Sequence, residues 1–195
     1  QQYLKDYSGQ VVETDDFRHA LEAVSGRSLA KFFDQWVYGQ GYPKLEVKMA
    51  FDSARERLSF KFEQSNPGAK DDTDAEPFEM EIEVAIQSDE GIWQTYCVQM
   101  DARHAGLSLP LAKTPQQVVI DPEGKVLHKL VFDPGQDVLL RMARECPHLL
   151  GRIHAVETLL DGGKPDAVAG VSAAYAEESH WGVRIATARA LGKVG

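Results

Sequence analysis

The stretch from Ser28 to Val47 constrains the fold of this chain most strongly, because the spacing of its apolar residues changes there from a helical to a strand period. Its first part places apolar side chains on one helical face, at Leu29, Phe32, Phe33, Trp36 and Val37, with Ser28 as the expected N-cap. Gly39, Gly41 and Pro43 are expected to end this helix. Beyond them the apolar residues alternate with polar or small ones, at Leu45, Val47, Met49 and Phe51. A helical region is therefore predicted to end here and a β region to begin.

The sequence predicts a pair of antiparallel helices before this change, at 15–25 and 28–38. Thr14 is the expected N-cap of the first helix, and acidic residues follow in its first turn, where the helix dipole favours negative charge. The stripe expected to be buried consists of Phe17, Leu21 and Val24, and Gly26 is placed to end the helix. We expect residues 1–40 to be the closing helices of one domain.

Residues 44–132 contain short strand-like segments separated by turn signals, at a spacing typical of an antiparallel β-sandwich. The expected strands lie near 44–51, 57–64, 78–87, 92–100, 106–111, 117–121 and 125–132. In the third, apolar residues from Phe78 to Ile86 alternate with glutamates, which predicts one buried and one solvated face. The residues from Asp121 to Gly124 have β-turn chemistry and are expected to join the last two strands as a hairpin. We expect this β-sandwich domain to span residues 41–133.

The helical period returns after Phe132, with helices expected near 136–145, 149–160, 165–178 and 181–193. The last of them, WGVRIATARALGKVG, resembles the second helix of a HEAT-type repeat, in which small residues let neighbouring helices approach closely. We expect residues 134–195 to be a truncated HEAT-like region that continues into further repeats. The predicted fold class is thus multidomain α+β: a helix pair, an antiparallel β-sandwich and a helical-repeat region.

Composition excludes some classes of function. The formal net charge of −9 over 195 residues argues against a surface for nucleic acid or anionic membranes, because both need clustered Lys and Arg. No run approaches the ~18 apolar residues of a membrane span, so we expect a soluble protein, whose compartment these residues do not reveal. Cys97 and Cys146 are far apart in sequence and are expected to be buried thiols rather than a disulfide or a zinc knuckle.

The spacing of histidines and carboxylates offers few metal sites. No histidine has another at i, i+4 among His19, His104, His128, His148, His154 and His180. His154 and Glu157 have the i, i+3 spacing of some carboxylate–imidazole sites, but two ligands are fewer than zinc needs, and we expect a surface pair. His128 shares a strand face with apolar residues and is expected to be structural. An acidic loop lacks the spaced order of a calcium loop and is expected to be solvated, at Asp71, Asp72, Asp74 and Glu76.

Nucleophilic and aromatic sites are not indicated either. Ser25, Ser28 and Ser59 lack a G-x-S-x-G context and an acid and histidine in hydrolase order. A binding platform is one interpretation of the aromatic residues Phe32, Phe33, Trp36, Tyr38 and Tyr42, but helical spacing beside a domain boundary favours interdomain core. Trp93 and Tyr96, on a predicted strand, are interpreted in the same way. Trp36 is expected to be buried at the junction of the helix pair and the sandwich. We therefore predict no catalytic, cofactor-binding or metal-binding residue in this chain.

The first fifty residues resemble the zinc-dependent aminopeptidases of the aminopeptidase N type. The catalytic thermolysin-like domain of that family closes with a helix pair similar to TDDFRHALEAVSGRSLAKFFDQWV, and GYPKLEV resembles the entry to the β-sandwich that follows. The remainder is similar in architecture alone. The family's H-E-x-x-H motif with its downstream glutamate, and its G-x-M-x-N motif, do not occur here. The resemblance therefore implies a piece from downstream of an active site.

For the parent protein, the resemblance implies a zinc enzyme that removes N-terminal residues from peptides, with zinc bound upstream and not by this fragment. The fragment would supply architecture and substrate access, with the upstream catalytic domain and peptide substrates as partners. The alternative is an interaction scaffold of the same architecture without peptidase activity, as in a TATA-binding-protein-associated factor. The presence of the missing motifs upstream would distinguish these hypotheses.

Overall fold

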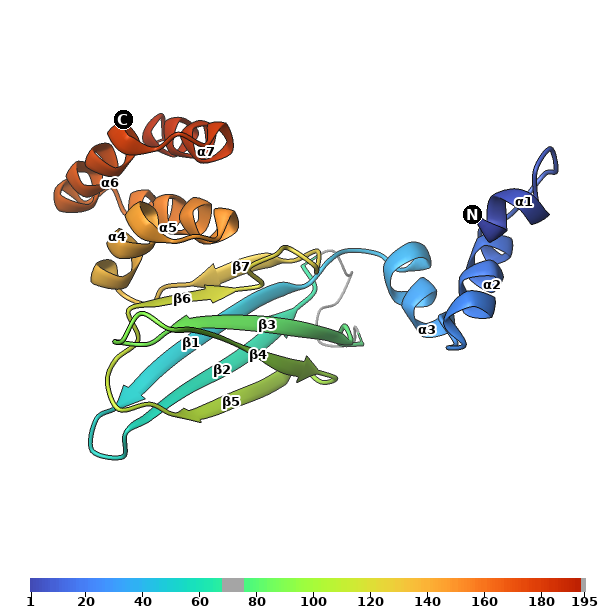
Figure 1. Cartoon of the computed structure of the whole chain (residues 1–195), viewed down its shortest axis with the longest axis horizontal. Coiled ribbons are helices and arrows are strands. Elements are labelled where there is room, and N and C mark those ends of the chain that lie inside the picture. The colour runs from blue at the N-terminus through green and yellow to red at the C-terminus, as the bar shows by residue number, and fades with distance from the viewer. Residues whose placement is uncertain (68–75, 194–195) are drawn as a thin grey trace.

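A computed structural model describes residues 1–67 and 76–193 and shows a mixed α+β fold (Figure 1). The helices are α1 (Gln2–Asp6), α2 (Thr14–Ser25), α3 (Ala30–Phe33), the π-helical turn η1 (Asp34–Tyr38), α4 (Gln136–Glu145), α5 (Leu149–Asp161), α6 (Pro165–Glu177) and α7 (Trp181–Leu191). The strands are β1 (Lys44–Asp52), β2 (Arg57–Ser65), β3 (Met80–Gln87), β4 (Trp93–Met100), β5 (His104–Pro110), β6 (Gln117–Ile120) and β7 (Lys129–Phe132). Helices thus give way to strands within the stretch that the sequence singles out.

The strands form two sheets that face each other across one apolar core. One sheet has the order β5-β2-β1-β7, and the other has the order β4-β3-β6. The predicted alternation in β3 is confirmed, because Ile82 and Val84 are fully buried while Glu81 is exposed. Phe60 and Phe62 of β2 are nearly inaccessible in the same core, and burial of side chains of this size contributes about 1.5–3 kcal/mol each. A one-residue slip of β3 would bury its glutamates, so this core also determines the register.

The hairpin predicted between the last two strands does not form. The turn itself is present, with the Gly124 N–H donating to the Asp121 carbonyl at 3.1 Å. However, β6 pairs with β3, whereas β7 lies parallel to β1 in the other sheet, so the turn connects the two sheets. Pairing with β1 lets β7 bury Phe132 in the core between the sheets, and within the turn the buried Asp121 carboxylate accepts the N–H groups of Lys125 and Val126.

Helices α4 and α5 pack against β6 on the outer face of the β4-β3-β6 sheet, and α6 and α7 pack on these two helices in turn (Figure 1). Ala85 of β3 and Val119 of β6 share a second apolar core with buried residues of these helices, among them Met142 and Val156. Gly151 of α5 allows the close approach, because a Cβ at this position would lie only 2.8 Å from Cys146 Sγ and 2.9 Å from Val119 Cγ2. This part of the sheet is therefore covered on both faces.

The N-terminal helices lie apart from this body and differ from the sequence prediction (Figure 1). The expected buried stripe of α2 is not buried: Phe17, Leu21 and Val24 are 43%, 38% and 74% exposed. The helix predicted over 28–38 consists of the short α3 and the π-turn η1, and it begins after Leu29 without a side-chain cap. The N-cap of α2 is Glu13 rather than Thr14, since Asp16 reaches back to accept the Glu13 N–H at 2.9 Å.

Candidate functional site

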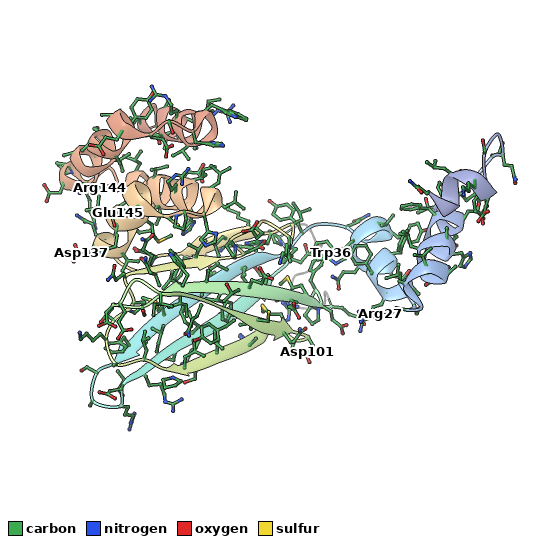
Figure 2. All side chains as sticks on the ribbon, in the orientation of Figure 1. Arg27, Trp36, Asp101, Asp137, Arg144 and Glu145 are labelled. Atoms are coloured by element: carbon green, nitrogen blue, oxygen red, sulfur yellow. The ribbon has the colours of Figure 1, made fainter. Side chains whose placement is uncertain are left out.

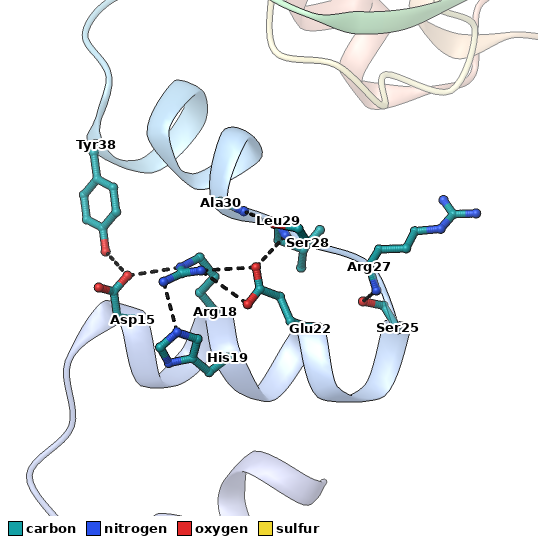
Figure 3. Close-up of polar contacts among 10 residues, drawn as sticks. All are labelled: Asp15, Arg18, His19, Glu22, Ser25, Arg27, Ser28, Leu29, Ala30 and Tyr38. Atoms are coloured by element: carbon teal, nitrogen blue, oxygen red, sulfur yellow. Dashed lines mark hydrogen bonds and ion pairs between the residues drawn. The ribbon is translucent and has the colours of Figure 1, made fainter.

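A polar network centred on Arg18 joins α2 to α3 and η1 (Figure 3). The guanidinium lies 3.2 Å from a carboxylate oxygen of Asp15 on one side and 3.2 Å from one of Glu22 on the other. Glu22 also accepts the Leu29 N–H at 2.6 Å, and the Tyr38 hydroxyl donates to Asp15 at 3.1 Å. Spacings of i, i+3 and i, i+4 place both carboxylates on the same helical face as the arginine.

The electrostatics of this network indicate structure rather than catalysis. Hydrogen bonds from Arg18 and then Tyr38 lower the pKa of Asp15, and the hydrogen bond from the Leu29 N–H is the main cause of a lowered pKa at Glu22. Desolvation, followed by the hydrogen bond to Asp15, raises the pKa of Tyr38. A general acid or base needs a pKa near the working pH, and these pKa values move away from neutrality. The network therefore holds both carboxylates ionised and orders the helix pair.

A second set of contacts connects η1 to the two sheets, around Trp36 (Figure 2). The Trp36 ring centroid lies 4.9 Å from that of Phe78, and the Gln35 carboxamide bonds to the main chain of Glu79. The prediction that Trp36 lies at this junction is confirmed, but its side chain is half-buried rather than fully buried. The neighbouring aromatic residues do not form one platform, since Phe33 contacts the rings of Phe17 and Phe32 within the helices.

His154 lies in a groove of about 730 Å³ between β7 and the helices α4 and α5. Its Nε2 donates to the Phe132 carbonyl at 2.8 Å, and its ring stacks on that of Phe132. Burial lowers the pKa of this imidazole. Glu157 is exposed on the same helix, so the pair has the predicted spacing, but the Nε2 of His154 is already used for the main chain. The expectation of a surface pair is therefore wrong for His154, which is half-buried and bonded to the main chain, while Glu157 alone is exposed.

The other histidine of interest, His128, belongs to the connection between the two sheets. Its Nδ1 lies 2.9 Å from the Val126 carbonyl and 3.7 Å from the buried carboxylate of Asp121. It precedes β7 rather than lying within a strand. These contacts hold the connection between β6 and β7, which agrees with the structural role expected for His128.

The remaining candidates do not form a nucleophilic or calcium site in the described part of the chain. The hydroxyl oxygens of Ser25 and Ser28 lie near main-chain N–H groups, and Ser59 donates to the Ala50 carbonyl. Asp71, Asp72 and Asp74 lie outside the described residues. On the later strand, Trp93 makes an edge contact with His148 at 5.1 Å and Tyr96 donates to Gln94.

The two cysteines are both free, and one of them differs from prediction. Cys146 is buried as expected, and burial raises the pKa of its thiol. Cys97 is exposed, because its position in β4 directs the side chain to the outer face of the sheet. The pKa of Cys97 is also raised, first by desolvation and then by the charges of Glu81 and Glu83, which disfavours a reactive thiolate.

Within residues 1–67 and 76–193, no three side chains of His, Cys, Asp or Glu gather in a way that could hold a metal ion. The described helices also include none with the length and apolar character needed to cross a membrane.

Part of this chain is similar in sequence to known aminopeptidases. Over 72 residues it is 35% identical to aminopeptidase A of Gloydius brevicauda and 33% identical to glutamyl aminopeptidase of Bitis rhinoceros. The matched segment is 36% of this chain and 8% of each relative, so the chain spans less than a tenth of the curated relatives it matches. No family model matches the chain.

The fold itself is similar to a solved aminopeptidase structure. The crystal structure of Legionella pneumophila aminopeptidase A in complex with aspartic acid matches 91% of this chain with a TM-score of 0.68. The sequence identity is 16%, and the match covers 22% of that protein. Helices, sheets and C-terminal helices therefore follow one another here in an arrangement similar to that in part of a much longer aminopeptidase.

Some features of the site had a sequence signal and others did not. The Asp15–Arg18–Glu22 spacing is visible in the sequence, so the Arg18 network was predictable from helical geometry. The bonds between Gln35 and Glu79 join residues 44 positions apart and have no local pattern. Only the folded chain reveals them.

Proposed function

We propose that this chain is the part of a zinc-dependent aminopeptidase of the aminopeptidase N type that follows the catalytic residues. In this assignment residues 1–40 are the closing helices of the catalytic domain, 41–133 a β-sandwich, and 134–195 the start of a HEAT-like helical region. The observation that carries the proposal is the fold match, which includes 91% of this chain but only 22% of the aminopeptidase. The independent sequence match to named aminopeptidases supports it.

The described residues of this chain do not fit a zinc site, so we assign no chemical step to them. A catalytic zinc needs three protein ligands, and the described residues bring no such set together. The His154 Nε2, the best candidate, is hydrogen-bonded to the Phe132 carbonyl. In the proposed enzyme this chain supplies a spacer and the beginning of a helical wall, while zinc and the catalytic glutamate belong to the preceding domain.

The experiment is to determine the coding sequence upstream of this segment and to assay the full-length product. We expect H-E-x-x-H, a downstream glutamate and G-x-M-x-N upstream, and hydrolysis of aminoacyl chromogenic amides that a chelator abolishes and zinc restores. A panel of glutamyl, aspartyl, leucyl and arginyl amides would define the preferred residue. A full-length protein that lacks these motifs and shows no turnover would contradict the proposal and favour an interaction scaffold of the same architecture.

A further inference from the structure

The two helical parts of the molecule are attached to the sheets in different ways. Helices α4 to α7 share a continuous apolar core with the β4-β3-β6 sheet. The N-terminal helical unit, residues 1–38, has no buried residue in α2 or η1. Its one buried side chain in α3, Phe33, contacts the rings of Phe17 and Phe32, which belong to the same unit. Small polar interfaces allow relative motion of the parts they join.

A polar pairing connects this unit to the sheets at the residue that precedes β3. The Gln35 Oε1 accepts the Glu79 N–H at 2.7 Å, and the Gln35 Nε2 donates to the Glu79 carbonyl at 3.0 Å. The main chain of Glu79 thus makes with Gln35 the same two hydrogen bonds that it would exchange with an opposite residue in an antiparallel ladder. The Gln35 side chain substitutes for a missing strand at this point.

Other contacts of the junction are less directional and partly exposed to solvent. Lys31 pairs with the Glu79 carboxylate, but the lysine side chain is 71% exposed, and ion pairs this open to water contribute little. Trp36 adds an apolar contact with Phe78 and remains half-exposed. The two hydrogen bonds of Gln35 are therefore the most directional contacts between the helical unit and the body.

The connecting segment joins the helical unit to β1 and contains two glycines. It runs from Gly39 to Pro43, and Gly41 has a φ of +85°, a conformation that side-chain-bearing residues rarely adopt. One side-chain contact of this segment with the body is the hydrogen bond from Asn66 Nδ2 to the Gln40 carbonyl at 3.1 Å. Figure 1 shows this segment running between the N-terminal helices and β1.

We propose that the Gln35–Glu79 pairing is a latch that sets the angle between the N-terminal helical unit and the two-sheet body. When the pairing breaks, both parts stay folded and the unit pivots at Gly39–Gly41. Each of the two hydrogen bonds exchanges for bonds to water at low net cost, so latched and unlatched states are both accessible. This inference concerns the chain itself and does not depend on the proposed function.

The test uses the whole chain with spin labels on Cys97, the exposed native thiol, and on a cysteine introduced by Ser25→Cys at the exposed end of α2. Cys146 is buried and stays unlabelled in the folded protein. In a Gln35→Ala variant we expect a broader distribution of label-to-label distances. We also expect amide exchange of Glu79 to become faster on the order of tenfold, since its N–H loses its acceptor.

The matched control is Gln10→Ala, which removes a side-chain to main-chain hydrogen bond inside the helical unit, from Gln10 Nε2 to the Asp6 carbonyl. It should leave the distance distribution unchanged. Gln35→Glu, which cannot donate to the Glu79 carbonyl, should broaden the distribution as Gln35→Ala does. An unchanged distribution in both Gln35 variants, or loss of sheet structure in both, would overturn the proposal.

Discussion

Replacement of Gly151 by alanine tests how the C-terminal helices are joined to the sheet. The new Cβ would lie 2.8 Å from Cys146 Sγ, 2.9 Å from Val119 Cγ2 and 3.3 Å from Val119 Cγ1. Ordinary contacts begin near 3.4 Å, so α5 must move away from β6 and from the end of α4. Both neighbours are nearly inaccessible and have little room to yield.

The expected cost follows from two opposing effects. Overpacking of a tightly packed core typically costs about 1–3 kcal/mol. Exchange of glycine for alanine in a helix interior gains about 0.8–1 kcal/mol, and less at the third residue of α5, where the helix is only beginning. We therefore predict a net loss of about 1–2 kcal/mol, which for a chain of this size lowers the melting temperature by about 2–4 °C per kcal/mol.

Urea and thermal unfolding of Gly151→Ala, followed by far-ultraviolet circular dichroism, would measure this loss. Trp93 provides a local probe, because it contacts His148 at the same helix–sheet interface. The matched control is Gly162→Ala at the other end of α5, where a Cβ meets no atom within 4 Å. If Gly151→Ala is as stable as wild type while the control is unchanged, the close approach inferred at this interface is wrong.

Three further predictions concern separate contacts. The pKa values of Asp15 and Glu22 are held below the ordinary 3.8 and 4.5, so their stabilisation of the helix pair is present above pH 4.5. This stabilisation should be lost as the pH falls through the lowered pKa values. Amide exchange would show the loss as reduced protection of the Leu29 N–H, which Glu22 accepts. Trp36→Ala should cost about 1–2 kcal/mol, less than the ~3–5 kcal/mol typical of a fully buried tryptophan, because this ring is half-exposed. A variant with the melting temperature of wild type would contradict the stabilising contact between Trp36 and Phe78. Glu178→Ala should cost about 1–3 kcal/mol, because the Glu178 carboxylate is 8% exposed and lies 2.9 Å from the Arg152 guanidinium. Glu177→Ala, at an exposed neighbouring position, should leave stability unchanged. Equal urea midpoints for the two variants would contradict the stabilising role of the Glu178–Arg152 pair.

The alternation of apolar and polar residues made much of the β region predictable. The alternation from Phe78 to Ile86 determines which face of β3 is buried, and the structure confirms it. Turn chemistry was less informative, because Asp121–Gly124 indicates a reversal of the chain without indicating which strand the next one will pair with. The partner of β7 is β1, which lies far earlier in the chain and in the other sheet, and no local pattern indicates that pairing.

The helical spacing of apolar residues predicted where helices form, but it did not predict which elements pack against their apolar faces. Phe17, Leu21 and Val24 form an apolar face of α2, as the spacing indicates, yet no element of the described chain buries that face. The π-turn η1 could not be predicted either, since its residues follow the same spacing as an α-helix would. In the candidate site, the charged network was readable from i, i+3 and i, i+4 spacing, whereas the Gln35 pairing was not.

The most direct measurement on the chain itself is its zinc content together with its turnover of aminoacyl chromogenic amides. The purified chain is incubated with zinc, dialysed, and examined for bound metal and for hydrolysis, with a zinc aminopeptidase as the positive control. We predict substoichiometric zinc and no metal-dependent turnover, because the described residues bring together no set of metal ligands. Stoichiometric zinc, or turnover that a chelator abolishes, would contradict the claim that this chain supplies architecture rather than chemistry.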